Sequence, residues 1–268
     1  MAKKILLTGA TDGIGKQTAM ELFKQGHELI IHGRNADKTE ATKEEILSGF
    51  KKGKVHTAVA DFSALRNIEK LSEDLHDRFD RIDVLINNAG IYMNGFRESA
   101  DGFEMTFAVN HLATFALTLR MLDLIKSPGG RIVTVASMAH ASSPPLNLED
   151  VNNESTFDPY TAYAHSKLCN ILFAKELAVK LRERGITSNS LHPGVIDTKL
   201  LRAGFGGGGS SVEKGAETPI YLAVSGEVEN ISGKYFINKQ LSEPSVEAKD
   251  KQAQQELWKY SEKHTGLQ

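Results

Sequence analysis

The chain is 268 residues long, with 40% apolar residues, 25% charged residues and a formal net charge of -2. This length is enough to bury a large core, and the composition is typical of soluble globular proteins. The 32 basic and 34 acidic residues nearly balance and form no long Lys/Arg run. We therefore expect no nucleic-acid partner.

Two further features bear on the compartment. Cys169 is the only cysteine, so an intramolecular disulfide is excluded and nothing indicates an oxidising environment. The apolar run 5–7 that follows Lys3 and Lys4 is far too short for a signal-peptide core or a membrane span. We expect a cytoplasmic protein with no membrane anchor.

Apolar runs and turn residues predict strands and helices that alternate along the chain. The expected strands are 5–8, 27–32, 55–60, 82–86, 131–136, 187–191 and 233–237. The expected helices are one that runs through 23, then 37–47 with a break at 49–53, 63–79 capped by Ser63, 103–125, a helix through Tyr163 to about 184, 212–224, and a last one around Trp258. The stretches 140–159 and 200–211 are expected to be loops that shape the substrate site.

Strands that alternate with helices imply a parallel sheet with helices on both faces. We predict an α/β fold, a Rossmann-type doubly wound parallel sheet of about seven strands, in a single domain 1–268. In such a sheet, ligands bind outside the carboxyl ends of the strands. The features that follow expected strands are the glycine turn 9–15, Asp61, the run 87–90, Ser137, and Pro193 with Gly194.

The glycine turn is the first candidate site. Gly9, Gly13 and Gly15 stand between the first strand and the first helix with the spacing Gly-x-x-x-Gly-x-Gly. Glycines there let the backbone approach a pyrophosphate, and the following helix presents its positive end. The turn lacks the Lys-Ser/Thr pair of nucleoside triphosphatases. A dinucleotide is therefore favoured over a purely structural turn.

Tyr163 and Lys167 are the second candidate. Residues four apart share a helix face, so the phenol and the ammonium project to the same side. A nearby cation favours the phenolate and lowers the pKa of a phenol from its usual ~10. This spacing is common by chance, so it becomes a candidate proton donor only through its neighbours at the sheet edge.

Taken together, the motifs resemble those of the short-chain dehydrogenase/reductase family, in family order and over almost the whole chain. They are Thr8-Gly9-x-x-x-Gly13-x-Gly15, Asn87-Asn88-Ala89-Gly90, Asn110, Ser137, Tyr163-x-x-x-Lys167 and Pro193-Gly194. A finer likeness, to the retinol dehydrogenase-like branch, lies in Ser137-Met138-Ala139-His140, Tyr163-Ala164-His165-Ser166-Lys167-Leu168, Leu191-His192-Pro193-Gly194 and Ile231-Ser232-Gly233-Lys234-Tyr235. The resemblance implies hydride transfer between a nicotinamide cofactor and a small carbonyl or alcohol substrate, which that branch suggests is hydrophobic.

The resemblance also implies a role for each motif residue. Tyr163 would donate a proton to the substrate oxygen, and Ser137 would hydrogen-bond that oxygen. Lys167 would lower the pKa of the phenol and hold the nicotinamide ribose, and Asn110 would organise a water that relays protons. Asp61 would bond the adenine. Besides Tyr163 and Lys167, the implied cofactor contacts are Gly9, Thr11, Asp12, Gly13, Ile14, Gly15, Arg34, Asn35, Asp61, Phe62, Asn88, Ala89, Gly90, Pro193, Gly194, Val195 and Thr198.

The end of the second strand bears on the choice between NAD(H) and NADP(H). NAD enzymes place an acidic residue there for the ribose 2′-hydroxyl. The sequence His32-Gly33-Arg34-Asn35 offers no carboxylate, and Arg34 suits a 2′-phosphate. We expect NADP(H), with NAD(H) as the alternative because Asp12 puts a negative charge in the glycine turn.

Some alternatives stay open. The nine histidines form no zinc-like pattern with cysteine, so we expect no metal, while His140 and His192 flank the expected cleft as candidate substrate contacts. An NADP(H)-binding redox sensor without turnover is the alternative function, against which Asn110, Ser137, Tyr163 and Lys167 favour an enzyme. The resemblance allows a homodimer or homotetramer through the long helices, and the glycines after Thr198 suggest a mobile lid.

Overall fold

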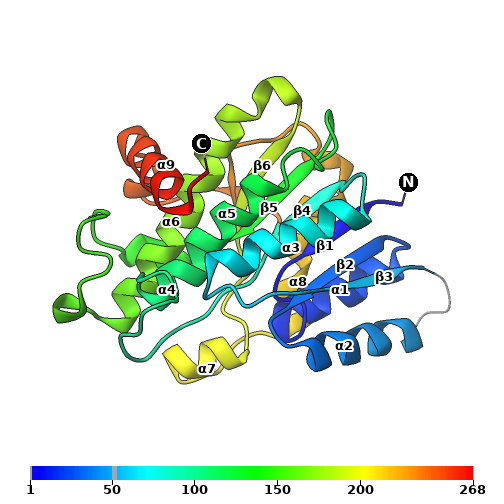
Figure 1. The fold of residues 1–268 in the computed structure, drawn as a ribbon, viewed down its shortest axis with the longest axis horizontal. Helices are drawn as coiled ribbons and strands as arrows, with labels where there is room; N and C mark the ends of the chain where they lie inside the picture. The colour runs from blue at the N-terminus through cyan, green and yellow to red at the C-terminus, as the bar shows by residue number, and fades with distance from the viewer. Residues whose placement is uncertain (1, 50–52, 268) are drawn as a thin grey trace.

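The computed structural model describes residues 2–49 and 53–267, and its centre is one eight-stranded sheet. The strand order is β3-β2-β1-β4-β5-β6-β7-β8, and the neighbours are parallel except for β7 and β8 (Figure 1). The predicted doubly wound parallel sheet is confirmed. The strands are β1 (Lys4–Leu7), β2 (Glu28–Gly33), β3 (Val55–Val59), β4 (Val84–Asn87), β5 (Arg131–Val135), β6 (Thr187–His192), β7 (Tyr235–Ile237) and β8 (Gln240–Ser242).

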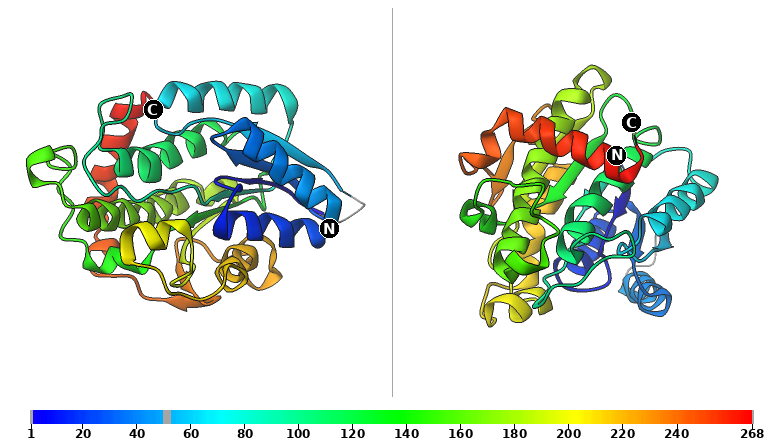
Figure 2. Two further views of the ribbon diagram at one scale, coloured as in Figure 1. Left: turned by 90° about the horizontal axis from the view of Figure 1, so that it is seen from below. Right: turned by 60° about the vertical axis from the view of Figure 1, so that its left-hand side comes forward.

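Helices cover both faces of the sheet, because side chains alternate along each strand and leave two apolar surfaces to bury. α1 (Gly13–Lys24), α2 (Ala36–Gly49) and α8 (Val212–Val224) share a buried apolar cluster with one face. α3 (Leu65–Arg78), α5 (Ala113–Arg120) and α6 (Pro159–Lys180) cover the other face. Figure 2 shows α3 and α8 on opposite sides of the strands. α9 (Lys251–Thr265), around Trp258 as predicted, packs against α6.

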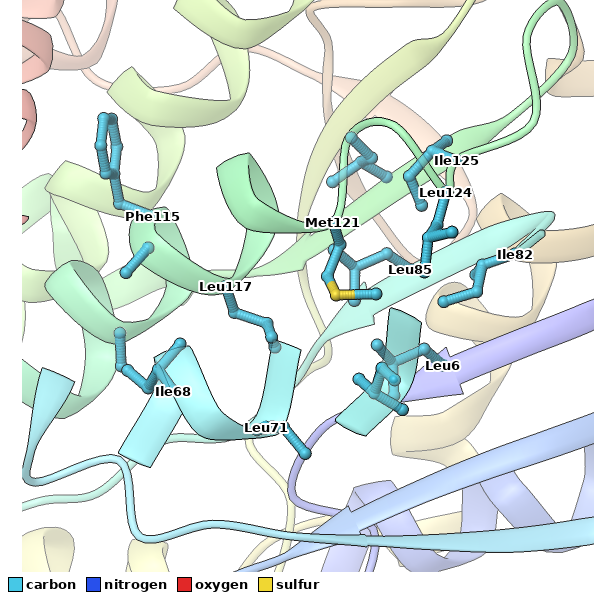
Figure 3. Close-up of a cluster of buried hydrophobic side chains, with 14 of the residues drawn as sticks. Leu6, Ile68, Leu71, Ile82, Leu85, Phe115, Leu117, Met121, Leu124 and Ile125 are labelled. Carbon is cyan, nitrogen blue, oxygen red and sulfur yellow. The ribbon is translucent and has the colours of Figure 1, made fainter. Parts of the chain in front are cut away.

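The core between α3, α5 and the sheet holds the centre of the fold together (Figure 3). Ile68 of α3 and Leu117 of α5 are fully buried with Leu6 of β1 and Leu85 of β4. Burying one such side chain contributes about 1.5–3 kcal/mol relative to exposure. Because these strands are tightly packed, the positions of the turns that follow their carboxyl ends are fixed.

The sheet has one strand more than the seven predicted. β8 pairs antiparallel with β7 through a turn in which Asn238 (φ 50°) and Lys239 (φ 64°) both have positive φ. Two positive φ values are typical of the tight hairpin turn whose usual signal is Asn-Gly. Lys239 replaces that glycine, and β8 is short and polar, so neither the turn nor the strand carried its usual sequence signal.

The predicted helix 103–125 is wrong as a single element. It consists of α4 (Met105–Phe107), a π-helical turn (Ala108–Leu112) and α5. Ser63 does not cap α3, since the N-cap is Ala64 without a side-chain bond, and Asp101 accepts a hydrogen bond from the backbone N of Leu65 instead. α6 ends at Lys180, and only a 3-10 turn follows to Arg184. Pro219 lies inside α8 as expected.

The two predicted loops are partly helical. The stretch 140–159 contains the 3-10 turn Glu154–Thr156, and most of α7 (Lys199–Phe205) falls within 200–211. Thr198 caps α7 and Gly206, with positive φ, ends it. Of the predicted break 49–53, residues 50–52 lie outside the described part of the chain.

Candidate active site

The carboxyl ends of four adjacent parallel strands bring the expected site segments to one edge of the sheet. The glycine turn follows β1, the run 87–90 begins at the end of β4, Ser137 follows β5, and Pro193 follows β6. In the sheet order, these strands are direct neighbours. Segments far apart in sequence therefore meet, as the parallel-sheet rule predicts.

The glycine turn packs too closely for side chains. Gly9 (φ +65°) and Gly13 (φ +50°) adopt the left-handed region. A Cβ at Gly15 would lie 2.1 Å from the carbonyl oxygen of Gly9, and a Cβ at Gly9 would lie 2.8 Å from Cα of Ala89. The turn leads into α1, whose N-cap Asp12 accepts a hydrogen bond from the backbone N of Gly13. The N-terminus of α1 thus begins at this edge of the sheet.

Thr8 and Asn88 tie the glycine turn to the segment after β4. Thr8 Oγ1 accepts hydrogen bonds from the backbone N of Asn88 (2.9 Å) and of Ala89 (3.0 Å). Asn88 Nδ2 donates to the carbonyl oxygens of Thr8 (2.8 Å) and Gly9 (3.1 Å). The side chain of Asn88 thus holds the turn in shape, and its predicted contact with the cofactor stays a prediction.

Asn110 lies in the π-helical turn and fixes the backbone beside α6. Its Oδ1 accepts from the backbone N of Ile91 (2.8 Å), and its Nδ2 donates to Ile91 O (3.0 Å) and Ser166 Oγ (2.9 Å). A Cβ at Gly90 would lie 3.3 Å from both Asn110 Oδ1 and Lys167 Nζ. Single π turns inside helices are frequent at functional sites.

Tyr163, Lys167 and Ser137 converge at the carboxyl end of β5. The side chain of Tyr163 is buried on α6 and lies beside that of Ser137, which acts to lower the pKa of the phenol. Lys167 Nζ lies 5.5 Å from the centroid of the Tyr163 ring and donates to the carbonyl oxygen of Val135 (3.2 Å). The phenol and the ammonium share a face of α6, as their spacing indicated.

Burial controls the protonation of this pair. It raises the pKa of Tyr163 to about 12, against the lowering effect of the Ser137 side chain. It lowers the pKa of Lys167 to about 8. Loss of solvent is the largest cause of the raised pKa of the phenol, and the Lys167 ammonium is bonded to Val135 O. The expected lowering of the phenol pKa by Lys167 stays a prediction.

His140 and His192 are buried, with 3% and 7% of their surface exposed, and their contact with substrate stays a prediction. The Nδ1 of His140 donates to the carbonyl oxygen of Ser137 (2.6 Å), and its Nε2 accepts from the backbone N of Ser245 (3.1 Å). His140 therefore links the turn that carries Ser137 to the segment after β8.

α7 touches two ends of the site. At its start, Thr198 Cγ2 would lie 3.2 Å from a Cβ at Gly13, and Lys199 pairs with the carboxylate of Asp12. At its end, the Phe205 ring lies 5.9 Å from that of Tyr163 and 5.3 Å from that of Tyr92. Tyr92, Lys199 and Phe205 could not be predicted from the sequence, because no local spacing relates them to Tyr163.

The other expected contacts lie around the same edge. Arg34 and Asn35 follow β2 and are exposed, and Asn35 Oδ1 accepts from the backbone N of Lys38 (2.9 Å). Asp61 is exposed after β3 and accepts a hydrogen bond from the backbone N of Ser63, while Phe62 is buried.

The remaining expected contacts lie in the glycine turn and after β6. The side chain of Thr11 lies against Gly33, and that of Ile14 lies against Gly215. Pro193, Gly194 and Val195 follow β6.

The described residues offer neither a metal-binding cluster nor a membrane-spanning helix. Within 2–49 and 53–267, no group of three or more His, Cys, Asp or Glu side chains could hold a metal ion. In the same part of the chain, no helix is both long and apolar enough to cross a bilayer. Metal-free chemistry stays a prediction from the sequence.

Comparison with known proteins gives a family. Residues 3–205 match the model described as short chain dehydrogenase. Retinol dehydrogenase 13 of Mus musculus is 37% identical over 282 residues, covering 99% of this chain and 84% of that protein. An uncharacterized protein from Mycobacterium paratuberculosis has a structure with TM-score 0.83 and 31% identity, covering 98% of this chain and 93% of its own. A short chain dehydrogenase from Shigella flexneri, solved with NADP, has TM-score 0.73 and 22% identity, covering 89% and 97%.

Fold, motif geometry and family match together define an oxidoreductase that acts on a small molecule. The chain belongs to the short-chain dehydrogenase/reductase family, and its relatives place it in the retinol dehydrogenase-like branch. The resemblance seen in the sequence is confirmed at both levels.

Proposed function

We propose that this oxidoreductase uses NADP(H) to interconvert a carbonyl and an alcohol on a small hydrophobic substrate. The observation that carries the proposal is that the side chains of Tyr163, Ser137 and Lys167 converge at the edge where the glycine turn lies. A phenol and a hydroxyl held together can bind one substrate oxygen from two sides. One of them, the phenol, can also transfer a proton to it.

The residues at this edge fit a nicotinamide dinucleotide. Gly9 and Gly15 leave no room for a Cβ against neighbouring backbone, so the turn keeps a tight shape at the N-terminus of α1, where a pyrophosphate would bind. Gly90 leaves a surface without a side chain beside Asn110 and Lys167, where a ribose would lie. When bound, the cofactor supplies or accepts the hydride.

The protonation of Tyr163 suits carbonyl reduction at neutral pH. With its pKa raised to about 12, the phenol carries the proton that it would donate to the substrate oxygen. Ser137 would hold that oxygen, and Asn110 keeps the backbone beside Lys167 in place. Alcohol oxidation needs the phenolate, which the buried ammonium of Lys167 would stabilise electrostatically.

The preference for NADP(H) is supported by charges around the glycine turn. Arg34 is exposed at the end of β2, where no carboxylate is present. The negative charge of Asp12 is countered by Lys199, and also by Lys38, which contributes to lowering the pKa of Asp12. The Shigella flexneri relative that was solved with NADP supports the same choice.

Aromatic and apolar groups around Tyr163 support a hydrophobic substrate. The Tyr92 and Phe205 rings lie 5.5 Å and 5.9 Å from its ring, and Leu200 packs in the same cluster. Apolar lining with a few polar groups is typical of small-molecule sites. The name of the relative from Mus musculus, a retinol dehydrogenase, points the same way.

We also propose that residues 1–268 form a single catalytic domain and that the protein is cytoplasmic. One sheet takes its strands from residues 4–242, which supports the first point. The single cysteine, Cys169, is free and buried, which supports a compartment where thiols stay reduced.

The test is NADPH consumption by the purified protein against a panel of aldehydes and ketones. We expect turnover with hydrophobic carbonyls, and a loss of at least about a hundredfold in Tyr163→Phe with NADPH affinity retained. The matched control is Tyr221→Phe, because Tyr221 is a tyrosine of α8 whose hydroxyl donates a hydrogen bond to Glu227. Tight NADPH binding without turnover of any carbonyl would instead favour a redox sensor.

A further inference from the structure

His32 connects three segments at the adenosine side of the sheet edge. It stands one residue before the end of β2, and its side chain is 3% exposed. The backbone N of Gly9 donates to its Nδ1 (3.3 Å), and its Nε2 lies 3.0 Å from the carbonyl oxygen of Ala60. Its ring stacks on Phe62 with centroids 4.2 Å apart and planes at 16°.

These contacts specify one form of the imidazole. Because the Gly9 amide is a donor and the Ala60 carbonyl is an acceptor, Nδ1 must accept and Nε2 must carry the proton. Burial lowers the pKa of His32 to about 4, so the neutral ring persists at physiological pH. A rigid planar group therefore spans the gap between the glycine turn and the end of β3.

We propose that His32 positions the adenosine half of the cofactor site by fixing the glycine turn relative to Asp61 and Phe62. The inference rests on the proposed NADP(H) function, in which the turn meets the pyrophosphate and Asp61 the adenine. One dinucleotide has to satisfy both contacts at once, so their separation determines its affinity. His32 does not reach the reacting atoms, and it acts as a positioning residue through Gly9 and Ala60.

His27 offers a matched control just before β2, at the opposite edge of the sheet. Its Nδ1 accepts a hydrogen bond from the backbone N of Lys3 (3.1 Å), and it is 7% exposed. Both histidines thus join the β1 region to the β2 region by a backbone donor and an Nδ1 acceptor. Only His32 lies beside the glycine turn.

The experiment compares His32→Phe with His27→Phe, using three ligands. NADPH spans the whole site, adenosine 2′,5′-bisphosphate contains only the adenosine half, and reduced nicotinamide mononucleotide lacks that half. For His32→Phe, we expect the dissociation constants of NADPH and the bisphosphate to rise about tenfold, as for the loss of two hydrogen bonds. Its kcat at saturating NADPH and its kcat/KM with the mononucleotide should stay within about twofold of the unaltered protein.

The outcomes separate positioning from general stability. His32→Gln, which keeps one donor and one acceptor, should recover part of the affinity, and it replaces His32→Phe if that variant cannot be purified. Unchanged NADPH affinity, or an equal loss with all three ligands, overturns the proposal. An equal loss in His27→Phe also overturns it. If the unaltered protein binds neither NADPH nor the bisphosphate, the proposed function fails with it.

Discussion

In the proposed function, cofactor choice depends most directly on Arg34. It is exposed at the end of β2, and no carboxylate stands beside it in the sequence His32-Gly33-Arg34-Asn35. A guanidinium can bind a phosphate through two parallel hydrogen bonds, which a hydroxyl cannot match. Asp12 would oppose a phosphate if it were unpaired, but Lys199 neutralises it from α7.

Arg34→Ala should therefore reduce the ratio of kcat/KM for NADPH to that for NADH. Charge-assisted hydrogen bonds contribute about 1.5–3 kcal/mol, which corresponds to about ten- to a hundredfold. Steady-state kinetics with both cofactors measures the ratio. Arg81→Ala removes an equal charge before β4, beside Asp83, and should leave the ratio unchanged. A full NADPH preference in Arg34→Ala would contradict the assignment.

Some residues of the site could be predicted from sequence and others could not, for a physical reason. Gly9, Gly15, Tyr163 and Lys167 reveal themselves by local spacing, since a turn and one helix face are short-range structures. Phe205 reaches Tyr163 only through the tertiary path of α7. The protonation of Tyr163 also escaped prediction, because burial depends on the whole fold.

At the scale of elements, α7 and the π-helical turn were not predicted from the sequence. The glycines 206–209 favour a loop, yet Thr198 and Gly206 provide a cap at each end of a short helix before them. The π turn around Asn110 adds a residue to an otherwise continuous apolar pattern and leaves no signal in it. The first seven strands and the helices α1, α2, α3 and α8 have clear sequence patterns, so their existence was predicted and only their ends shifted.

Phe205→Ala should change substrate selection by removing the ring that α7 holds over Tyr163. Its contacts with Tyr92, Tyr160 and Tyr163 are each worth about 0.5–1.5 kcal/mol. We expect kcat/KM to fall about tenfold for a bulky hydrophobic carbonyl and much less for a small one. Val246→Ala, an exposed apolar residue after β8, is the control. An unchanged ratio between large and small carbonyls would refute a role for α7 in selection.

At the scale of the whole molecule, α9 covers one side of the long helix α6. Trp258 of α9 packs its ring against Phe115 of α5 and stacks on Phe173 of α6 at 6.0 Å. Figure 1 shows α9 beside these helices. A second copy could pair through this surface only by displacing α9, so we propose that a homodimer or homotetramer would form through other surfaces.

The fold should lose stability in mild acid because several histidines are buried neutral. Burial lowers the pKa of His32 and His192 to about 4 and that of His111 to about 3. In the unfolded chain they bind protons below about pH 6.5, so the unfolded state takes up more protons as the pH falls from there to about 4. Their stabilisation is complete above pH 6.5 and decreases below it.

Urea unfolding between pH 7.5 and 5 measures this effect. We expect the free energy of unfolding to fall by about 1–2 kcal/mol per buried histidine at pH 5. His111→Gln, which can still bond Ser261, should make the dependence about one third less steep. A free energy that is constant over this range would show that the folded protein protonates these rings without cost.

The position of α7 also bears on the order in which molecules leave the protein. α7 extends from the glycine turn, where Lys199 pairs with Asp12, to Tyr163, the proposed proton donor. The glycines after it, Gly206, Gly207 and Gly208, all have positive φ. If α7 moved, its backbone would rotate at these glycines. A swing of α7 that frees the product would therefore also uncover the dinucleotide. Release of the product and release of the dinucleotide would then both require α7 to move, and the rate of that movement would set the upper limit of kcat.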